Sequence, residues 1–284
     1  MSEAVAFRSG ARTTRVGSIV THAVLVLGAV LMIGPFVWQV LTALKSESEV
    51  TNVPPTVLPL EWVWGNFAEV FTSLPFGQQL VNSIVVAAVC TIGQLAFCAL
   101  GAYAFARLEF PGRGLLFALF LSVLMVPKQL LILPQYQIMS WLGLLNTLPA
   151  LILPGVFSAF GTFLLRQFFM TIPKELEEAA VLDGAGRFRI FYSVMLPLVK
   201  PALAALAVIT MMHAWNDLLW PLVVNTDPAT MPISAGLTSM QGQFRTNYPV
   251  LMAGSFLASI PMIVAYLALQ RQFVQGIALS GVKG

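Results

Sequence analysis

Few side chains in this sequence could do chemistry within its long apolar segments, and those few are ionisable, amide or aromatic. Lys128 and Asp217 each carry a charge inside such a segment, and His213 precedes Asp217 by one helical turn. A charge in an apolar environment is costly and usually faces a protein interior or a water-filled path. The residues expected along such a path are Lys128, His213, Trp215, Asn216, Asp217 and Trp220.

Pairing of Lys128 with Asp217 is one of several interpretations. Counted at 1.5 Å per residue from the expected outer end of each segment, the two charges lie at similar depths, about 8 Å and about 10 Å. They could pair across a path. Alternatively, Lys128 could extend to the membrane surface and Asp217 could cap a helix break at Pro221. Trp215 and Trp220 suit stacking on sugar rings, and they equally suit an aromatic belt at a membrane interface.

Enzyme chemistry has little support in the sequence. There are two histidines, no nucleophile–histidine–acid arrangement and no paired carboxylates in an apolar segment. Cys90 and Cys98 would lie about 12 Å apart on one helix, too far for a disulfide. None of the five lysines follows a glycine, so the GxxxxGK(S/T) loop of ATPases is missing. A metal site, a membrane enzyme and an ATPase are therefore disfavoured.

The elements that position these residues are predicted to be membrane-spanning helices. Of the 284 residues, 58% are hydrophobic and 10% are charged, whereas soluble domains have about 25% charged residues. Charge-free stretches separate Glu69 from Arg107, Lys128 from Arg166 and Arg245 from Arg271. Each exceeds the ~20 residues that a helix needs to cross a membrane. We predict an all-α integral membrane protein with six spans, at 19–44, 80–106, 114–133, 147–169, 198–224 and 250–269.

Positive charges predict the orientation of these spans. Twelve of the fifteen lysines and arginines lie on one side, against Lys45 and Arg245 on the other, with Lys128 inside a span. Since positive residues concentrate on the cytoplasmic side, both termini are expected there. The chain then divides into an N-terminal arm (1–18), a membrane-spanning domain (19–270) and a C-terminal tail (271–284). The net charge of +3 is too small and scattered for a nucleic-acid surface.

Segment 170–197 is the substantial hydrophilic segment on the expected cytoplasmic side. Thr171 can cap a helix with Pro173 in its first turn, and Gly184 can supply the left-handed residue that ends it. A second short helix is predicted for 187–196. Acidic residues suit the start of a helix, and apolar residues at i, i+3 and i+4 share one face. The acidic residues are Glu175, Glu177 and Glu178, and the residues of the apolar face are Leu176, Ala179 and Ala180.

The residues of this segment resemble the EAA loop of ABC importer permeases. The matching positions are Glu178-Ala179-Ala180, Gly184, Val194 and Leu196-Pro197, with Val194 where the family usually has isoleucine. Two further features resemble the carbohydrate-uptake branch, in particular the second permease of maltose-type importers. They are Trp215-Asn216-Asp217 with Trp220-Pro221, and the C-terminal Gly281-Val282-Lys283-Gly284. The resemblance extends over essentially the whole chain.

The resemblance implies a type I ABC importer permease fold and a coupling role for the loop. In that family the loop sits in a cleft of a cytoplasmic ATPase, which implies a role for Glu178, Ala179, Ala180, Asp183, Gly184, Leu196 and Pro197. It also implies that the tail Gly281, Val282, Lys283 and Gly284 enters the ATPase interface. From its glycines, segment 272–280 is expected to be extended, and the tail to be ordered only in the complex.

The resemblance further implies the partners and the location. The partners are a second homologous permease, two ATP-binding-cassette ATPase subunits, an extracytoplasmic solute-binding protein and the lipid of a prokaryotic cell membrane. This chain would have no cofactor and no enzyme activity, because ATP and magnesium would bind the partner ATPase. The expected function is import of a sugar or sugar-like solute by alternating access. Alternatives are a permease for glycerol 3-phosphate or glycerophosphodiesters, or a stand-alone secondary transporter or channel.

Overall fold

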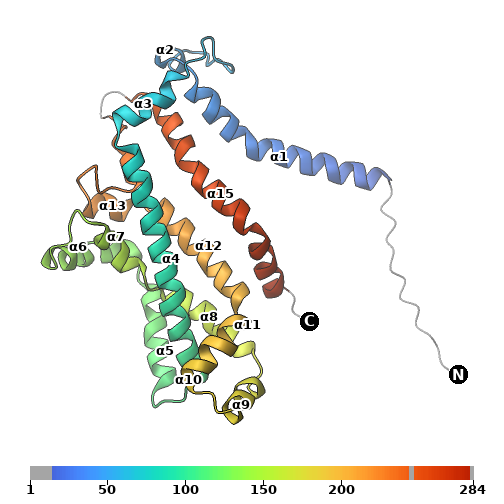
Figure 1. Ribbon diagram of the computed structural model, residues 1–284. Helices are drawn as coiled ribbons and strands as arrows, with labels where there is room; N and C mark the ends of the chain where they lie inside the picture. The colour runs from blue at the N-terminus through green and yellow to red at the C-terminus, as the bar shows by residue number, and fades with distance from the viewer. Residues whose placement is uncertain (1–14, 243–245, 282–284) are drawn as a thin grey trace.

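The computed structural model describes residues 15–242 and 246–281, and this part of the chain is helical without named strands (Figure 1). The α-helices are α1 (Arg15–Ala43), α2 (Glu47–Val50), α3 (Gly65–Ser73), α4 (Phe76–Arg107), α5 (Arg113–Ser122), α6 (Ile132–Trp141), α7 (Leu148–Ile152), α8 (Ala159–Thr171), α9 (Glu175–Leu182), α10 (Arg187–Arg189), α11 (Leu196–Leu198), α12 (Lys200–Asn216), α13 (Leu219–Val224), α14 (Ile233–Thr238) and α15 (Tyr248–Gly281). Short 3₁₀ segments are η1 (Val123–Met125), η2 (Lys128–Leu131) and η3 (Leu153–Gly155), and η4 (Ile190–Met195) is a π-helix.

Between three and six membrane crossings are compatible with the lengths of these helices. Gly17–Ala43, Phe76–Arg107 and Tyr248–Ala268 are each long and apolar enough to cross a membrane alone. Three further crossings result if each of three bent helix pairs counts as one: Arg113–Met125 with Lys128–Trp141, Leu148–Gly155 with Ala159–Thr171, and Arg187–Leu198 with Lys200–Asn216. The protein is therefore a multi-pass membrane protein. Each predicted span overlaps one of these six units, although the unit that overlaps 198–224 covers 187–216.

The third predicted span, 114–133, is wrong as a single straight helix. The chain bends by 96° between Arg113–Met125 and Lys128–Trp141. Pro127 has no N–H to donate and disfavours helical geometry in the residue before it; accordingly, Val126 is extended, with φ −87° and ψ 120°. Lys128 consequently begins a new helical segment at the bend and does not lie within a continuous span.

The fourth and fifth predicted spans, 147–169 and 198–224, are also interrupted. Helices α7–η3 and α8 meet at an angle of 41°, and the Ser158 side chain caps the new helix by accepting a hydrogen bond from Gly161 N at 3.1 Å. Helix α12 ends at Asn216, and α13 starts at Leu219. Asp217 between them is extended, so this span continues only after a break.

Helix α4 is the central element of the bundle. It runs from the α2–α3 end to the α9–α10 end of the molecule and packs against α8 and α12 along the way (Figure 1). Helix α15 packs against α12, α3 and the end of α1, whereas the remainder of α1 extends away from the body. None of the most apolar part of α1 is buried, so its apolar surface is available to lipid or another subunit.

The C-terminal helix is longer than predicted. Segment 272–280 was expected to be extended, but α15 continues from Tyr248 through Gly281. Once a helix is formed, each added residue gains a hydrogen bond, and that gain outweighs the ~1 kcal/mol cost of one internal glycine, Gly276. Residues 282–284 of the predicted ATPase-interface tail lie outside the described residues.

Candidate functional site

The loop predicted to couple to an ATPase forms a compact helix–turn–helix, although it starts later than expected. Thr171 was predicted to cap its first helix, but Thr171 is the last residue of α8 and its hydroxyl donates to Phe168 O at 2.8 Å. Helix α9 begins at Glu175 instead, after Pro173 has separated it from α8. The first backbone bonds of α9 run from Glu177 N and Glu178 N to Lys174 O.

Gly184 ends α9 in the left-handed conformation, as the sequence predicts. Its φ is +80°, and its N–H donates to Val181 O at 2.9 Å. The next N–H, that of Ala185, donates to Ala180 O at 2.9 Å. This pair of bonds is the Schellman motif, which satisfies carbonyls that a helix end otherwise leaves unpaired. Asp183 is the residue at the helix end and is exposed.

The apolar face of α9 is divided between the protein and the solvent. Ala180 is partly buried and, with Ala185 beyond the turn, packs against the buried cluster at this end of the bundle. Ala179 and Glu178 are exposed, and so is Leu176. Of the three residues predicted to share one apolar face of α9, only Ala180 packs against this chain, whereas Leu176 and Ala179 remain exposed.

The second half of the loop is anchored by aromatic packing. Phe191 in the π-helix, Tyr103 on α4 and Phe169 on α8 form a buried trio. The ring centroids lie 5.2 Å apart for Tyr103–Phe191, 5.9 Å for Tyr103–Phe169 and 6.4 Å for Phe169–Phe191. The trio fixes the loop against two helices of the bundle.

The end of the loop lies close to its predicted position. The second short helix continues one residue past Pro197, to Leu198, and the chain then bends by 78° into α12. Leu196 packs against the same buried cluster as Ala180, while Pro197 is exposed.

The other side of the loop presents large apolar side chains to solvent. Leu182, Phe188 and Tyr192 are exposed by 89%, 83% and 72%. They come from the end of α9, from α10 and from the π-helix, so they surround the Gly184 turn in sequence. We call these three residues, together with the exposed Leu176 and Val181, the loop face.

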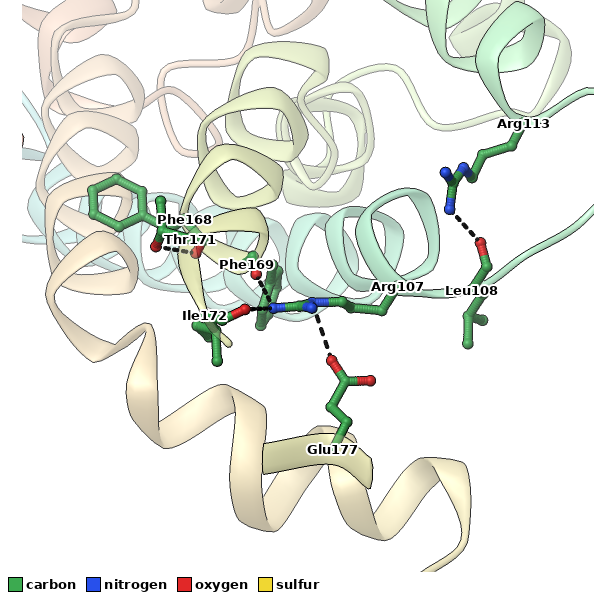
Figure 2. A network of polar contacts seen from close by, with 8 residues as sticks. All are labelled: Arg107, Leu108, Arg113, Phe168, Phe169, Thr171, Ile172 and Glu177. Carbon is green, nitrogen blue, oxygen red and sulfur yellow. Dashed lines mark hydrogen bonds and ion pairs between the residues drawn. The ribbon is translucent and has the colours of Figure 1, made fainter. Parts of the chain in front are cut away.

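Arg107, the last residue of α4, joins the loop to two helices of the bundle (Figure 2). Its Nε atom forms an ion pair with Glu177 Oε1 at 3.0 Å, and the two side chains are only 5% and 13% exposed. Its Nη2 atom donates to Phe169 O at 2.6 Å and to Ile172 O. One guanidinium therefore contacts the first turn of α9 and the last carbonyls of α8.

Sequence reasoning missed this contact. The sequence presents Arg107 only as one of the positive charges at the inner end of a span, and Glu177 only as one of three glutamates near a helix start. The signal available was an arginine at the end of a long apolar segment with a cluster of carboxylates elsewhere on the same expected side. That signal does not say which carboxylate is the partner.

The aromatic candidates for a solute path are buried in the protein. Trp215 belongs to the cluster between α4, α12 and α15, with 7% of its surface exposed. Trp220 belongs to the cluster of α6, α7 and α13, and its indole N–H donates to Ala150 O at 3.0 Å. Both side chains pack within this chain, so in this conformation they do not present their rings to a solute.

The polar candidates are exposed and do not form a direct ion pair. Lys128, His213, Asn216 and Asp217 are all exposed. Asn216 Nδ2 donates to Met212 O at 2.9 Å within α12. The carboxylate of Asp217 lies near enough to the backbone amides of Leu218 and Trp220, at the start of α13, to interact with them. No ion pair within 4.0 Å joins Lys128 to Asp217, although Lys128 and His213 are near enough for electrostatic interaction with its carboxylate.

The bundle of bent apolar helices with an exposed helix–turn–helix at one end fits the membrane permease fold expected from the sequence. The chain matches, over residues 6–278, the family described as "Binding-protein-dependent transport system inner membrane component", and it belongs to that family of ABC importer permeases.

Curated relatives agree with this assignment. The sn-glycerol-3-phosphate transport system permease protein UgpE of Yersinia pestis bv. Antiqua (strain Antiqua) is 39% identical over 267 residues, 91% of this chain and 95% of the relative. The arabinooligosaccharides transport system permease protein AraQ of Halalkalibacterium halodurans is 35% identical over 261 residues, 90% and 93% of the two chains.

A solved structure shares the fold. A chain of a bacterial ABC transporter involved in the import of the acidic polysaccharide alginate superposes with a TM-score of 0.79. The match covers 93% of this chain and 99% of the other, at 24% identity. The all-α permease fold expected from the sequence is thereby confirmed.

Proposed function

We propose that this chain is one of two different permease subunits of an ATP-driven importer, and that the α9–α11 loop docks on a partner ATPase. The single observation that carries the proposal is the two-sided geometry of the loop. Ala180 and Ala185 hold one side to the bundle, whereas Leu182, Phe188 and Tyr192 leave the loop face exposed. A large exposed apolar patch on a charged segment suits a protein partner.

The proposed topology has six spans, with both termini and the loop in the cytoplasm. Each bent helix pair then counts as one crossing. Support comes from the charge distribution of the sequence: the proposed spans place twelve of the fifteen lysines and arginines on the loop side, and positive residues favour the cytoplasmic face. The arm 1–18 and the tail 271–284 accordingly lie on the ATPase side, and α3 lies on the opposite side with the 45–79 segment.

The proposed assembly contains the second permease, two ATPase subunits and an external solute-binding protein. The family description, which names binding-protein-dependent transport, supports the last of these. ATP and magnesium would bind the ATPase subunits, because this sequence lacks the GxxxxGK(S/T) loop that holds nucleotide phosphates. The permease itself would then catalyse no reaction and would alternate between outward-open and inward-open states.

The proposed solute is a sugar or a sugar-like polyol. The relatives are named for sn-glycerol 3-phosphate and for arabinooligosaccharides, which are both rich in hydroxyl groups. A specific observation favours the phosphorylated alternative as a second candidate: the relative with 39% identity carries the sn-glycerol-3-phosphate name. Among the path candidates, Lys128 is the side chain with a charge opposite to that of a phosphate. Binding of labelled solutes to the cognate external protein distinguishes the two candidates.

Reconstitution of the four-component importer in proteoliposomes tests the proposal. Uptake should require ATP, and Glu178→Lys on the exposed side of α9 should lower uptake per ATP hydrolysed by about tenfold, a typical coupling effect. Glu109→Lys makes the same charge change at an exposed site outside the loop and should leave that ratio unchanged. ATP-independent uptake by this chain alone would instead indicate a secondary transporter or channel.

A further inference from the structure

The contacts of Arg107 join three segments that are far apart in sequence. The side chain leaves the end of α4, its Nη2 reaches the carbonyls of Phe169 and Ile172 at the end of α8, and its Nε meets Glu177 in the first turn of α9 (Figure 2). The contacts of Nη2 with the two carbonyls are charge-assisted hydrogen bonds, whereas the contact of Nε with Glu177 is an ion pair without hydrogen-bond geometry. The planar guanidinium thereby links all three segments.

Helix α9 has few other attachments near its start. No side chain of α9 is fully buried, and the helix packs mainly against the π-helix that follows it. The apolar contacts of Ala180 and Ala185 hold its C-terminal end. The ion pair of Glu177 with Arg107 is therefore the nearly buried contact that ties the N-terminal end of α9 to the bundle.

The same place is polar beyond the ion pair. The buried hydroxyl of Tyr103, one turn before Arg107 on α4, lies near enough to Glu177, Arg187 and Arg107 to interact electrostatically with their charges. Arg187 is the first residue of α10. The two arms of the loop thus bring a carboxylate and a guanidinium to one end of α4, while the loop face points to solvent.

We propose that Arg107 is a positioning residue for energy coupling, which makes α9 move as one body with α4 and α8. The inference rests on the proposed docking of the loop on an ATPase. When the ATPase displaces α9, the charge-assisted bonds of Arg107 transmit the displacement to α8 and to the end of α4. Since α4 packs against α8 and α12 and extends to the opposite end of the molecule, the displacement reaches the solute path.

The experiment measures uptake per ATP hydrolysed in the reconstituted importer, together with the amount of ATPase that co-purifies. Glu177→Gln and Arg107→Lys each remove part of the contact, and both should lower the coupling ratio by about tenfold while ATPase is still retained. The matched control is Glu175→Gln, an exposed glutamate on the same turn, which should stay within about twofold of wild type, as surface substitutions usually do.

A double variant separates coupling from simple stability. Arg107→Met with Glu177→Leu replaces the buried pair by apolar side chains of similar size, which buried pairs often tolerate. The assembled double variant should remain poorly coupled, because methionine cannot donate to the Phe169 and Ile172 carbonyls. Wild-type coupling in the double variant would overturn the inference. The double variant also keeps the inference testable if a single variant fails to assemble.

Failure of the inference is distinguishable from failure of the proposed function. If Glu178→Lys abolishes coupling while the Arg107 and Glu177 variants couple normally, the loop docks on the ATPase but Arg107 has no positioning role. If Glu178→Lys has no effect and uptake needs no ATP, the proposed function itself is wrong, and the inference falls with it.

Discussion

The turn at Gly184 allows a quantitative prediction for coupling. An alanine there would adopt φ near +80°, which costs an L-residue about 1–2 kcal/mol. An added Cβ would meet nothing within 4 Å, so the cost is due to the backbone alone. Because 1.4 kcal/mol corresponds to a tenfold change, Gly184→Ala should shift the loop about 5- to 30-fold toward states in which the Schellman turn is open. Ala180 and Ala185 would then lose their packing.

The assay is solute-stimulated ATPase activity and uptake of the reconstituted importer. Gly184→Ala should lower uptake per ATP, and Gly184→Asn should lower it less, because asparagine tolerates the left-handed region. The control is Gly186→Ala in the same loop: its φ is −72°, and an added Cβ also meets nothing within 4 Å. Gly186→Ala should change the stability of the loop by no more than about 0.5 kcal/mol. Equal defects at Gly184 and Gly186 would refute the reasoning from backbone conformation.

Three further predictions concern other parts of the chain. Trp220→Phe leaves the buried Ala150 carbonyl without its donor and should lower the stability of the purified complex by about 1–3 kcal/mol, measured by thermal unfolding. Lys128→Met combined with Asp217→Leu should transport no better than the worse single variant, because no direct ion pair joins them; recovery in the double variant would contradict this. Deleting 280–284 should change the ATPase rate without reducing the amount of inserted protein. An unchanged rate would show that the tail does not act at the ATPase interface.

The sequence was sufficient for the features that local rules control. Apolar length indicated the spans, and helical class followed because a backbone in lipid must satisfy its own hydrogen bonds. Gly184 in the left-handed region followed from the glycine at the end of a periodic segment. Both rules depend on neighbouring residues in the chain, so no knowledge of tertiary packing was required.

Tertiary packing decided the features that the sequence did not predict. Trp215 and Trp220 suit a sugar-binding surface by residue type, but both rings lie in buried clusters, Trp215 before the break at Asp217 and Trp220 after it. Pro221 and Asp217 indicate a helix break in the sequence. The direction that the chain takes after the break cannot be read from these residues. An aromatic residue near a break has the same sequence signature whether its ring faces a solute or the core.

The role of Arg107 depends on a rotation angle that the sequence does not contain. Helix α9 has three glutamates in its first turn, and successive helical residues are separated by about 100° around the axis. Only one can point at the end of α4, and which one does depends on how the Gly184 turn and the Ala180 contact orient the helix. In the structure Glu177 points inward and Glu178 points outward. Adjacent carboxylates thereby serve different faces of α9: Glu177 fixes it to the bundle, and Glu178 remains available to the proposed ATPase.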